Sequence, residues 1–360
     1  MKPMIVTKEA GVARASRSIS LKTLAVLLGA GVFGLAAGPA AALEKISFSL
    51  ASTIDGRSGP ILLAYDRGYF KDAGIDLDIV PGNGSANVVN RLASGTFQIG
   101  SGDIASVIKF DIQNPDKRVK AIFNEKLADL VIVALKGHGI AAPNDLKGRT
   151  IGAPTGDTAY KMFGAFSAAT GVMADDVKWD HMDMTIREAM LVQGKVDAIT
   201  ASYASAFFNL KALGIADSDM VFLRYSKYGV NIVGNGWMAN ESFLKEHPDT
   251  VRKMVAAFVH GWRDSIADPN AAIDSVFKRE PLLKRELEVP KLKDAAVALT
   301  DQPDAKATGI GSYSDATIKY TIGVLAAADK INPDIGFSDI VDLSFLPPLA
   351  ERTIPVQTMN

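Results

Sequence analysis

Cysteine is absent from the 360 residues, and histidine is scarce, with 4 copies. The lack of cysteine excludes disulfides, iron–sulfur clusters, thiolate zinc sites, cysteine nucleophiles and a lipid anchor on an N-terminal cysteine. No two histidines stand at metal-ligand spacing, and neither an HExxH nor a GxSxG motif occurs. We therefore expect no catalytic residue, no metal and no cofactor.

A surplus of one charge is also lacking. The 39 Lys and Arg residues against 40 Asp and Glu leave a net charge of −1. This balance is ordinary for a globular protein and gives no broad basic field for nucleic acid. We therefore expect no nucleic-acid partner.

No apolar run is long enough to cross a membrane. Residues 23–37 form an uncharged apolar run of 15 residues, shorter than the about 20 residues that a membrane-spanning helix needs. A basic segment precedes this run, and Ala40, Ala41 and Ala42 follow it as small residues suited to cleavage. We interpret residues 1–42 as a cleaved secretory signal peptide, which predicts a periplasmic protein; an uncleaved membrane anchor is the alternative.

The remaining chain alternates β-like and helical runs. Strands are predicted before residue 128 at 45–50, 76–80, 97–100 and 119–123. Strands are predicted after it at 130–135, 150–153, 196–200 and 220–225, with helices at 158–170 and 203–213. This order predicts an α/β protein with two units, each a mainly parallel sheet flanked by helices.

Helix signals accompany these runs. Ser58 and Ser85 are predicted helix caps, and Thr185 with Glu188 is a predicted capping box. Beyond residue 230 helices dominate. Asp249 is the predicted cap of a helix whose apolar stripe comprises Val251, Met254, Val255, Phe258, Val259 and Trp262. Further helices are expected near 290–300 and 314–330, and the Pro347-Pro348 pair should end regular structure before a loose tail.

Polar turns follow several predicted strands. The turns are residues 52–55, the Gly-rich residues 82–87, Gly102-Asp103, residues 154–158 (PTGDT) and Ser202-Tyr203. Residues 82–87 fail the GxGxxG dinucleotide pattern, because Asn87 stands at the third small position. Ligands of open α/β sheets bind at the carboxyl ends of strands. We therefore expect these turns to line a shared cleft, although Asp157 can also serve as a plain helix cap.

Longer segments carry a family resemblance. Residues 60–81 (PILLAYDRGYFKDAGIDLDIVP) resemble the periplasmic binding proteins for thiamine-pyrimidine precursors, nitrate, taurine and alkanesulfonates. Four more segments are similar in the same order: 92–100 (LASGTFQIG), 143–153 (PNDLKGRTIGA), 194–199 (GKVDAI) and 235–259 (NGWMANESFLKEHPDTVRKMVAAFV). Gln98 stands where that family usually has Asp.

The resemblance implies the type II periplasmic-binding fold. Lobe 1 would comprise 43–128 plus 230–360 with the C-terminal helices, and lobe 2 would comprise 129–229. Ligand would bind at the hinge, with hinge segments near 127–129 and 228–232. The partners implied are a small-molecule ligand and the permease and ATPase subunits of an ABC importer, with the binding protein itself a non-enzymatic monomer.

The expected ligand contacts combine these turns with the returning segment. They are Thr53, Asp55, Asn83, Gly84, Ser85, Gly102, Asp103, Thr155, Gly156, Asp157, Thr158, Ser202, Tyr203, Asn235 and Trp237.

The charges near these turns bear on the ligand. Asp55, Asp103, Glu125 and Asp157 lie near strand ends, with Arg57 as the one obvious cation. Such a site disfavours a naked anion and favours a nitrogen heterocycle or an amine-bearing solute, such as a pyrimidine precursor or a taurine-like compound. Tyr160, Tyr203 and Trp237 can supply stacking faces or can be core residues.

Several alternatives stay open. An alkanesulfonate or another organic anion is one. A same-fold enzyme is a second, although related thiamine-pyrimidine synthases carry a cysteine-rich iron motif and menaquinone-pathway enzymes of this fold are cytoplasmic. An exported protein that docks on a sensor is a third.

Overall fold

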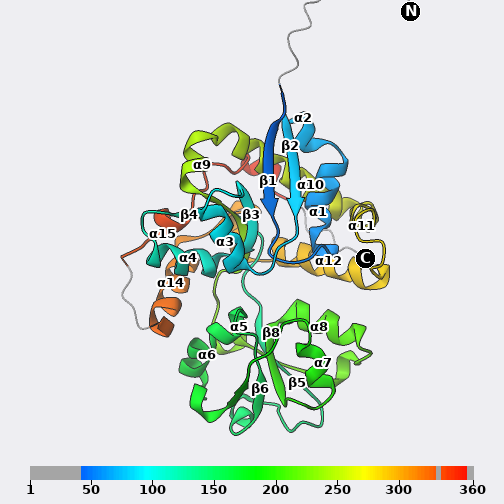
Figure 1. Cartoon of the computed structure of the whole chain (residues 1–360), viewed down its shortest axis with the longest axis vertical. Coiled ribbons are helices and arrows are strands. Elements are labelled where there is room, and N and C mark those ends of the chain that lie inside the picture. Colours follow the sequence, from blue (N-terminus) through cyan, green and yellow to red (C-terminus); the bar gives the residue numbers. More distant parts are fainter. Residues whose placement is uncertain (1–41, 330–333, 355–360) are drawn as a thin grey trace, which may run out of the picture. The chain divides into compact units, whose positions relative to one another are not determined.

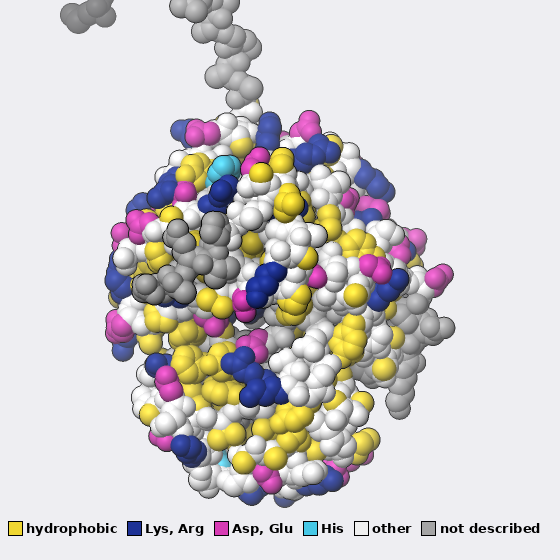
Figure 2. Space-filling model, turned by 180° about the vertical axis from the view of Figure 1, so that it is seen from behind, with side chains coloured by type: hydrophobic (Ala, Val, Ile, Leu, Met, Phe, Trp, Pro, Cys, Tyr) yellow, Lys and Arg dark blue, Asp and Glu magenta, His cyan; other side chains and the backbone are white. Residues whose placement is uncertain are grey.

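The computed structural model describes residues 42–329 and 334–354. The predicted signal peptide, apart from Ala42, and the last residues of the tail lie outside the described residues. None of the helices in the described ranges is long and apolar enough to cross a membrane. On the face seen in Figure 2, acidic and basic side chains are interspersed and do not gather in one large area of one sign.

The first sheet has five strands in the order β2-β1-β3-β10-β4; β1 and β2 lie side by side in Figure 1. The strands are β1 (Glu44–Ser49), β2 (Ile75–Val80), β3 (Ile99–Asp103), β4 (Val119–Asn124) and β10 (Asn235–Asn240). The pairs β1–β2 and β1–β3 are parallel, whereas β10 is antiparallel to both β3 and β4. Four strands therefore share one direction, and the returning strand β10 runs against them.

The second sheet repeats this arrangement in the order β7-β6-β8-β5-β9. Its strands are β5 (Leu130–Leu135), β6 (Thr150–Gly152), β7 (Lys178–Asp180), β8 (Ala198–Ser202) and β9 (Met220–Arg224). Here β5 is the strand antiparallel to its neighbours β8 and β9. In each sheet the antiparallel strand is thus the first strand after the chain crosses from the other sheet. The prediction of two α/β units with mainly parallel sheets is confirmed.

Two short segments join the sheets, residues 125–129 and residues 225–234, and they pair with each other. Leu127 and Val233 form an antiparallel bridge, and Gly234 donates its backbone N–H to the Lys126 carbonyl at 3.0 Å. A Cβ on Gly234 would lie 2.6 Å from the backbone nitrogen of Ala128. Only glycine therefore permits this close approach of the two crossing segments.

Helices flank both sheets and fill the C-terminal part (Figure 1). The helices between strands are α1 (Gly59–Asp66), α2 (Tyr69–Asp72), α3 (Ser85–Ala93), α4 (Ile104–Gln113), α5 (Thr158–Lys161), α6 (Phe163–Thr170), α7 (Arg187–Val192) and α8 (Tyr203–Ala212). The later ones are α9 (Glu241–Glu246), α10 (Pro248–Ala267), α11 (Pro269–Phe277), α12 (Arg285–Thr300), α13 (Pro303–Thr308), α14 (Asp315–Asp329), α15 (Phe337–Ile340) and α16 (Leu349–Arg352).

The apolar stripe predicted for α10 is confirmed. All six of its residues are buried, and they pack in one core with Phe48 of β1 and Trp237 of β10. Trp237 stacks on Phe258 with ring centroids 4.0 Å apart. The C-terminal helices therefore complete the core of the first sheet, and the aromatic groups of this core lie directly beneath the strand ends that face the second sheet.

Several local predictions are wrong. The helix predicted over 158–170 breaks at Met162 into α5 and α6. The short β7 was not predicted, nor was β10, which lacks apolar alternation. Strand β3 begins at Ile99, two residues later than predicted, and runs through Gly102 and Asp103, which were expected in a turn.

Three predicted caps are also wrong. Ser85 is the first residue of α3 and uses its hydroxyl to accept the Asp103 N–H at 2.9 Å, while Gly84, with φ +90°, occupies the cap position. Thr185 donates its hydroxyl to Asp183. Helix α10 begins at Pro248, before Asp249. In each case another hydrogen bond of the side chain or a proline start replaces the cap.

Two further expectations also fail. Ser58 makes no side-chain cap hydrogen bond to α1. The Pro347-Pro348 pair is followed by the short helix α16, because the Arg352 guanidinium anchors this end by donating to the Pro347, Thr308 and Ile310 carbonyls.

Candidate functional site

Two adjoining cavities lie where the strand ends of the two sheets and the crossing segments meet. The first compartment has a volume of about 230 Å³ and the second about 200 Å³. Six residues line both: Ala51, Ser52, Arg57, Lys126, Asp129 and Asn235. The crossing segments therefore supply part of the shared wall, where a bound molecule would touch the chain that joins the two sheets.

The first compartment combines aromatic and aliphatic groups with charged side chains, which are Asp55, Arg57, Glu125, Lys126, Asp129 and Asp294. Aromatic rings from β1, β10 and α10 form its floor, and small residues of α12 form one side. These residues are Phe48, Trp237, Phe258, Trp262, Ala295, Val297 and Ala298. Trp237 is 1% exposed, so only a small part of its ring reaches the cavity and its face is covered by Phe258.

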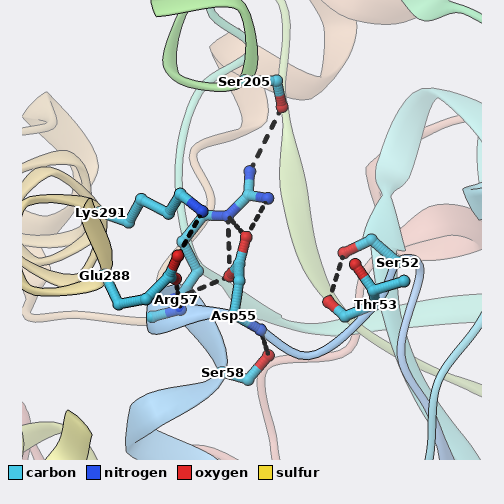
Figure 3. Close-up of polar contacts among 9 residues, drawn as sticks. Ser52, Thr53, Asp55, Arg57, Ser58, Ser205, Glu288 and Lys291 are labelled. Carbon is cyan, nitrogen blue, oxygen red and sulfur yellow. Dashed lines mark hydrogen bonds and ion pairs between the residues drawn. The ribbon is translucent and has the colours of Figure 1, made fainter. Parts of the chain in front are cut away.

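A paired cluster stands at the edge of this compartment (Figure 3). The Asp55 carboxylate accepts hydrogen bonds from the backbone N–H of Arg57 at 2.9 Å and from its Nη2 at 2.5 Å. Glu288 of α12 accepts the Gly56 N–H at 2.6 Å and pairs with Lys291 at 2.7 Å. Burial raises the pKa of Asp55, but Arg57 opposes burial and leaves it below the ordinary value. These charges therefore satisfy one another.

The crossing segments add three ionisable groups. Burial raises the pKa of Glu125 to about 7. Burial, together with Arg57, lowers the pKa of Lys126. Burial raises the pKa of Asp129, which pairs with Arg224 at 3.3 Å. Among the described residues, the Lys126 ammonium has no hydrogen bond or ion pair, so it can donate to a bound molecule.

The second compartment also has a mixed lining, with apolar groups such as Leu130 and Met184 beside charged and polar ones. Its lining includes Gly156, Asp157, Ser202, Ser205 and Arg187. Arg187 is 2% exposed and pairs with Glu188, 4% exposed, at 2.6 Å. Asp157 is 7% exposed, occupies the cap position of α5 without making a cap hydrogen bond, and leaves Oδ2 buried without a partner. A buried carboxylate oxygen without a donor is costly, which marks Asp157 as the unsatisfied group of this wall.

Two side-chain hydrogen bonds connect the two sides across the cleft. Thr158 donates its hydroxyl to Asp103 at 2.6 Å, and the Arg57 Nη1 donates to Ser205 at 3.5 Å. Burial raises the pKa of Asp103, although the Thr158 bond opposes this. Asp103 and Thr158 also line a third cavity of about 250 Å³ that extends along α4.

The NMT1/THI5-like family model matches residues 56–272, which is more than half of the 360 residues. The chain belongs to the NMT1/THI5-like family. This confirms the resemblance that the sequence motifs carry.

Two curated relatives of this family member are named for different functions. A riboflavin-binding protein of Chloroflexus aurantiacus is 27% identical over 240 residues, covering 64% of this chain and 65% of the relative. A 4-amino-5-hydroxymethyl-2-methylpyrimidine phosphate synthase of Saccharomyces cerevisiae is 24% identical over 257 residues, covering 68% and 74%. The chain thus matches slightly less than two thirds of the first relative's length.

A solved structure supports the fold assignment. The alkanesulfonate-binding protein SsuA of Xanthomonas axonopodis pv. citri, bound to MOPS, aligns with a TM-score of 0.63 at 13% identity. The alignment covers 84% of this chain and 99% of that chain. Together with the two sheets of matching order, it establishes the predicted type II periplasmic-binding fold.

The structure gathers ten of the predicted site residues around the cavities of this NMT1/THI5-like protein. They are Asp55, Gly84, Ser85, Asp103, Gly156, Asp157, Thr158, Ser202, Asn235 and Trp237. Which of them touch a ligand stays a prediction.

Five predicted residues line neither compartment. Thr53, Asn83 and Thr155 are exposed, and Gly102 is buried within β3. Tyr203 packs on Phe207 and Phe222, and the Arg224 guanidinium lies 3.6 Å from its ring centroid. Contacts with Phe207 of α8 and with Phe222 and Arg224 of β9 thus hold the Tyr203 ring away from the cavities.

Sequence reasoning missed Lys126, Asp129, Arg187 and Asp294, all of which line a compartment. The expectation that Arg57 is the one cation near the site is therefore wrong. Lys126 lies two residues beyond the end of β4, and the rule that ligands bind at carboxyl strand ends could have found it. Asp294 comes from a helix far away in the sequence, and no local signal marks it.

No group of three His, Cys, Asp or Glu side chains among the described residues is placed to hold a metal ion. The His181 ring contacts the Ala153 carbonyl at 3.1 Å, a structural role beside α5.

Proposed function

We propose that this chain is an extracytoplasmic solute-binding protein that captures a small organic molecule between two lobes and delivers it to an ABC importer. The observation that carries the proposal is the cavity at the crossing segments, with polar groups that lack partners. Asp157 offers an unpartnered acceptor from one side, and Lys126 offers a donor from the other. A site in which the chain's own groups leave these atoms unsatisfied is suited to binding a polar solute.

The preferred ligand is a nitrogen heterocycle or an amine-bearing compound, such as a pyrimidine precursor or a taurine-like solute. Asp157 favours a ligand that donates a hydrogen bond, because an ionised carboxylate only accepts. Lys126 requires that the same ligand also present an acceptor. An alkanesulfonate or another simple organic anion is the alternative, and Lys126 is the group that supports it.

Lobe closure follows from the same arrangement. We place lobe 1 at 43–128 plus 230–360 and lobe 2 at 129–229, with the hinge in the paired crossing segments. Bending at a few connecting residues would open and close the cleft. Small-angle scattering should show a smaller radius of gyration with ligand bound, and an unchanged radius in a sample shown to be ligand-free beforehand would contradict closure.

Export and delivery complete the proposal. A cleaved segment of residues 1–42 would place the chain in the periplasm, where permease and ATPase subunits of an importer receive the solute from a monomeric binding protein. Intact-mass measurement of periplasmic protein tests the cleavage, since a mass that retains residues 23–37 would indicate a membrane anchor.

The direct test is identification of the solute. The chain is purified and denatured, and any released small molecule is identified by mass spectrometry and then titrated back. At 100 times its Kd, a ligand adds about 2.7 kcal/mol to the free energy of unfolding. For a domain of this size that corresponds to a rise in Tm of roughly 5–10 °C. A panel of pyrimidines, amines and sulfonates that leaves Tm unchanged, with nothing released, would overturn the proposal.

A second candidate function is enzymatic, because one of the curated relatives is named a pyrimidine phosphate synthase. The same bound compound distinguishes the two. Under the binding proposal, its amount stays constant during incubation with the pure protein. Steady consumption of the compound, with a new product in the mass spectrum, would favour the enzyme.

A further inference from the structure

Helix α14, in the C-terminal part, is bonded to both ends of the second crossing segment. The helix contacts α4 beside the first sheet and α6 beside the second. Two neighbouring side chains bind the segment: the Tyr320 hydroxyl donates to the Gly229 carbonyl, and the Thr321 hydroxyl oxygen accepts the Val233 N–H at 2.9 Å. A bend of the chain at residues 230–232 would therefore move one bonded position relative to the other, whereas the two helix side chains keep their spacing.

The Gly229 end of this segment is attached to helices beside the second sheet. Gly229 ends a short 3₁₀ turn in which the Tyr225 hydroxyl donates to the Ala159 carbonyl of α5 at 2.8 Å. In the same turn, the Tyr228 ring packs edge-on against Phe166 of α6, with ring centroids 5.5 Å apart. Since α5 contacts β5 and β8, we expect Gly229 to move with the second sheet.

The Val233 end is attached to the first sheet. Val233 lies two residues before β10, which pairs with β3 and β4. The start of α14 is fixed to the same sheet, because Tyr313 donates its hydroxyl to the Phe123 carbonyl of β4 at 3.0 Å. Val233 and α14 thus belong to one side of the cleft, and the bond from Tyr320 to Gly229 joins that side to the other.

The two bonds differ in their access to water. Thr321 is 0% exposed, and without its oxygen the Val233 N–H would be buried without an acceptor, which is costly. Tyr320 is 42% exposed and Gly229 is exposed as well, so water can replace each as the partner of the other. Breaking the Tyr320 bond therefore costs much less than breaking the Thr321 bond.

We infer that α14 is a strap across the hinge, with Thr321 as its fixed anchor and the Tyr320 hydroxyl as its releasable end. The Tyr320–Gly229 bond is present in the structure, in which Thr158 also bonds to Asp103 across the cleft, and it breaks when the lobes part. Because it stabilises only the closed arrangement, it shifts the equilibrium toward closure without touching the solute. This inference rests on the lobe closure of the proposed function and adds a residue that controls it.

Spin labels measure the opening directly, and the absence of cysteine from the chain allows them to be placed at chosen sites. Asn209→Cys on α8 and Asp301→Cys after α12 put one label on each side of the cleft, both at exposed positions. Pulsed EPR on the chain freed of solute by unfolding and refolding then gives the distances between them. Asn209→Cys with Ala168→Cys on α6 places both labels on the second side, and this distance should be the same in every variant.

Tyr320→Phe removes the hydroxyl and keeps the ring. It should raise the ratio of open to closed distances about two- to tenfold, which is the factor that one hydrogen bond contributes. Tyr65→Phe is the matched control, because Tyr65 is also 42% exposed but lies on α1, away from the crossing segments. It should leave the ratio unchanged. Thermal melts verify that both variants are folded.

The outcomes separate this inference from the proposed function. Open and closed distances in the same ratio with Tyr320 and with Tyr320→Phe would overturn the strap and leave lobe closure standing, and so would an equal shift in Tyr65→Phe. One unchanged distance in all chains would overturn the strap together with lobe closure. Release of a solute from the purified chain tests the binding function independently of both.

Discussion

The two sides of the cleft differ in which of their charged side chains have hydrogen-bond partners. On the side of the first sheet, Asp55 is bonded to Arg57 and Glu288 to Lys291, so these charges already have partners. On the side of the second sheet, Arg187 and Glu188 form one closed pair, but Asp157 stays unpartnered. The first side thus keeps Asp55 and Glu288 paired but leaves the Lys126 ammonium and the Trp262 Nε1–H as donors without a partner among the described residues, whereas the second side leaves an acceptor, Asp157.

This difference indicates a division of roles. A buried ion pair that is already hydrogen-bonded, such as Asp55–Arg57, makes the wall around it more rigid. A wall with an unsatisfied buried group gains most when a donor arrives, because binding removes the penalty of the bare acceptor. We therefore expect Lys126 on the first side to select an acceptor on the ligand and Asp157 on the second side to select a donor.

The largest effect is expected from breaking the closed pair on the second side. Arg187→Ala leaves Glu188 buried without its partner, which should lower the free energy of unfolding by about 3–5 kcal/mol. Urea denaturation measures the change. Arg149→Ala removes a pair with Asp197 at 3.8 Å whose side chains are 38% and 36% exposed, and it should cost less than about 1 kcal/mol. Similar losses of stability in Arg187→Ala and Arg149→Ala would contradict the expected difference between a buried and an exposed ion pair.

The next effect concerns the unpartnered acceptor. Asp157→Asn replaces a charge-assisted hydrogen bond to the ligand, worth roughly 1.5–3 kcal/mol, so affinity for a donating ligand should fall about ten- to a hundredfold. Stability should change little, since Asp157 makes no cap hydrogen bond.

Calorimetry on the exposed control Asp175→Asn should give an unchanged Kd. An unchanged Kd for Asp157→Asn with an amine-bearing ligand would remove Asp157 from the site. Tighter binding of a sulfonate would favour an anionic ligand.

The sequence predicted the architecture better than the site. Alternating apolar residues identify strands such as β1 and β2, and the stripe on α10 identifies a buried helix, because burial selects these periods. Strand β10 carries Asn235, Gly236 and Asn240, and its ladder partners come from β3 and β4. No local pattern reveals such a strand, since distant pairing determines it.

From the sequence, site residues could be predicted only where they stand just after the end of a predicted strand. Asp103, Asp157 and Ser202 stand at strand ends and were found by that rule. Asp294 reaches the cavity from α12, and Tyr203 is turned away by Arg224 and Phe222. Both depend on how distant helices and side chains pack, which one sequence does not specify.

A smaller effect is expected from proton linkage at Glu125. Its folded pKa is about 7 against an ordinary value of 4.5, so the folded chain holds this proton more tightly than the unfolded chain. Below pH 4.5 the Glu125 carboxyl is protonated in both the folded and the unfolded state, so it does not lower the free energy of unfolding. Stability should then fall as pH rises from about 4.5 through 7, by up to about 1.4 kcal/mol per pH unit.

Glu125→Gln should flatten this part of the stability profile, measured by denaturation at several pH values. Asp111 of α4 is the matched comparison, because burial also raises its pKa to about 7 but it lines none of the three cavities. Asp111→Asn should flatten the stability profile as well, yet only Glu125→Gln should alter the pH dependence of ligand affinity. The same change of affinity in both variants would show that Glu125 does not sense the ligand.

The smallest effects are expected from the two hydrogen bonds that connect the sides of the cleft. The Thr158–Asp103 bond is short, at 2.6 Å, and its acceptor is a buried carboxylate, so Thr158→Val should cost about 1–2 kcal/mol. The Arg57–Ser205 contact is long, at 3.5 Å, and Arg57 keeps its bonds to Asp55 without it, so Ser205→Ala should lower the free energy of unfolding by less than about 0.5 kcal/mol.

Denaturation measures the loss of stability in both variants, and small-angle scattering without ligand reports whether either variant opens the cleft. Thr158→Ser retains the hydroxyl and should restore most of the loss. If Ser205→Ala opened the cleft while Thr158→Val did not, the Arg57–Ser205 contact, and not the Thr158–Asp103 bond, would be the one that holds the two sides together.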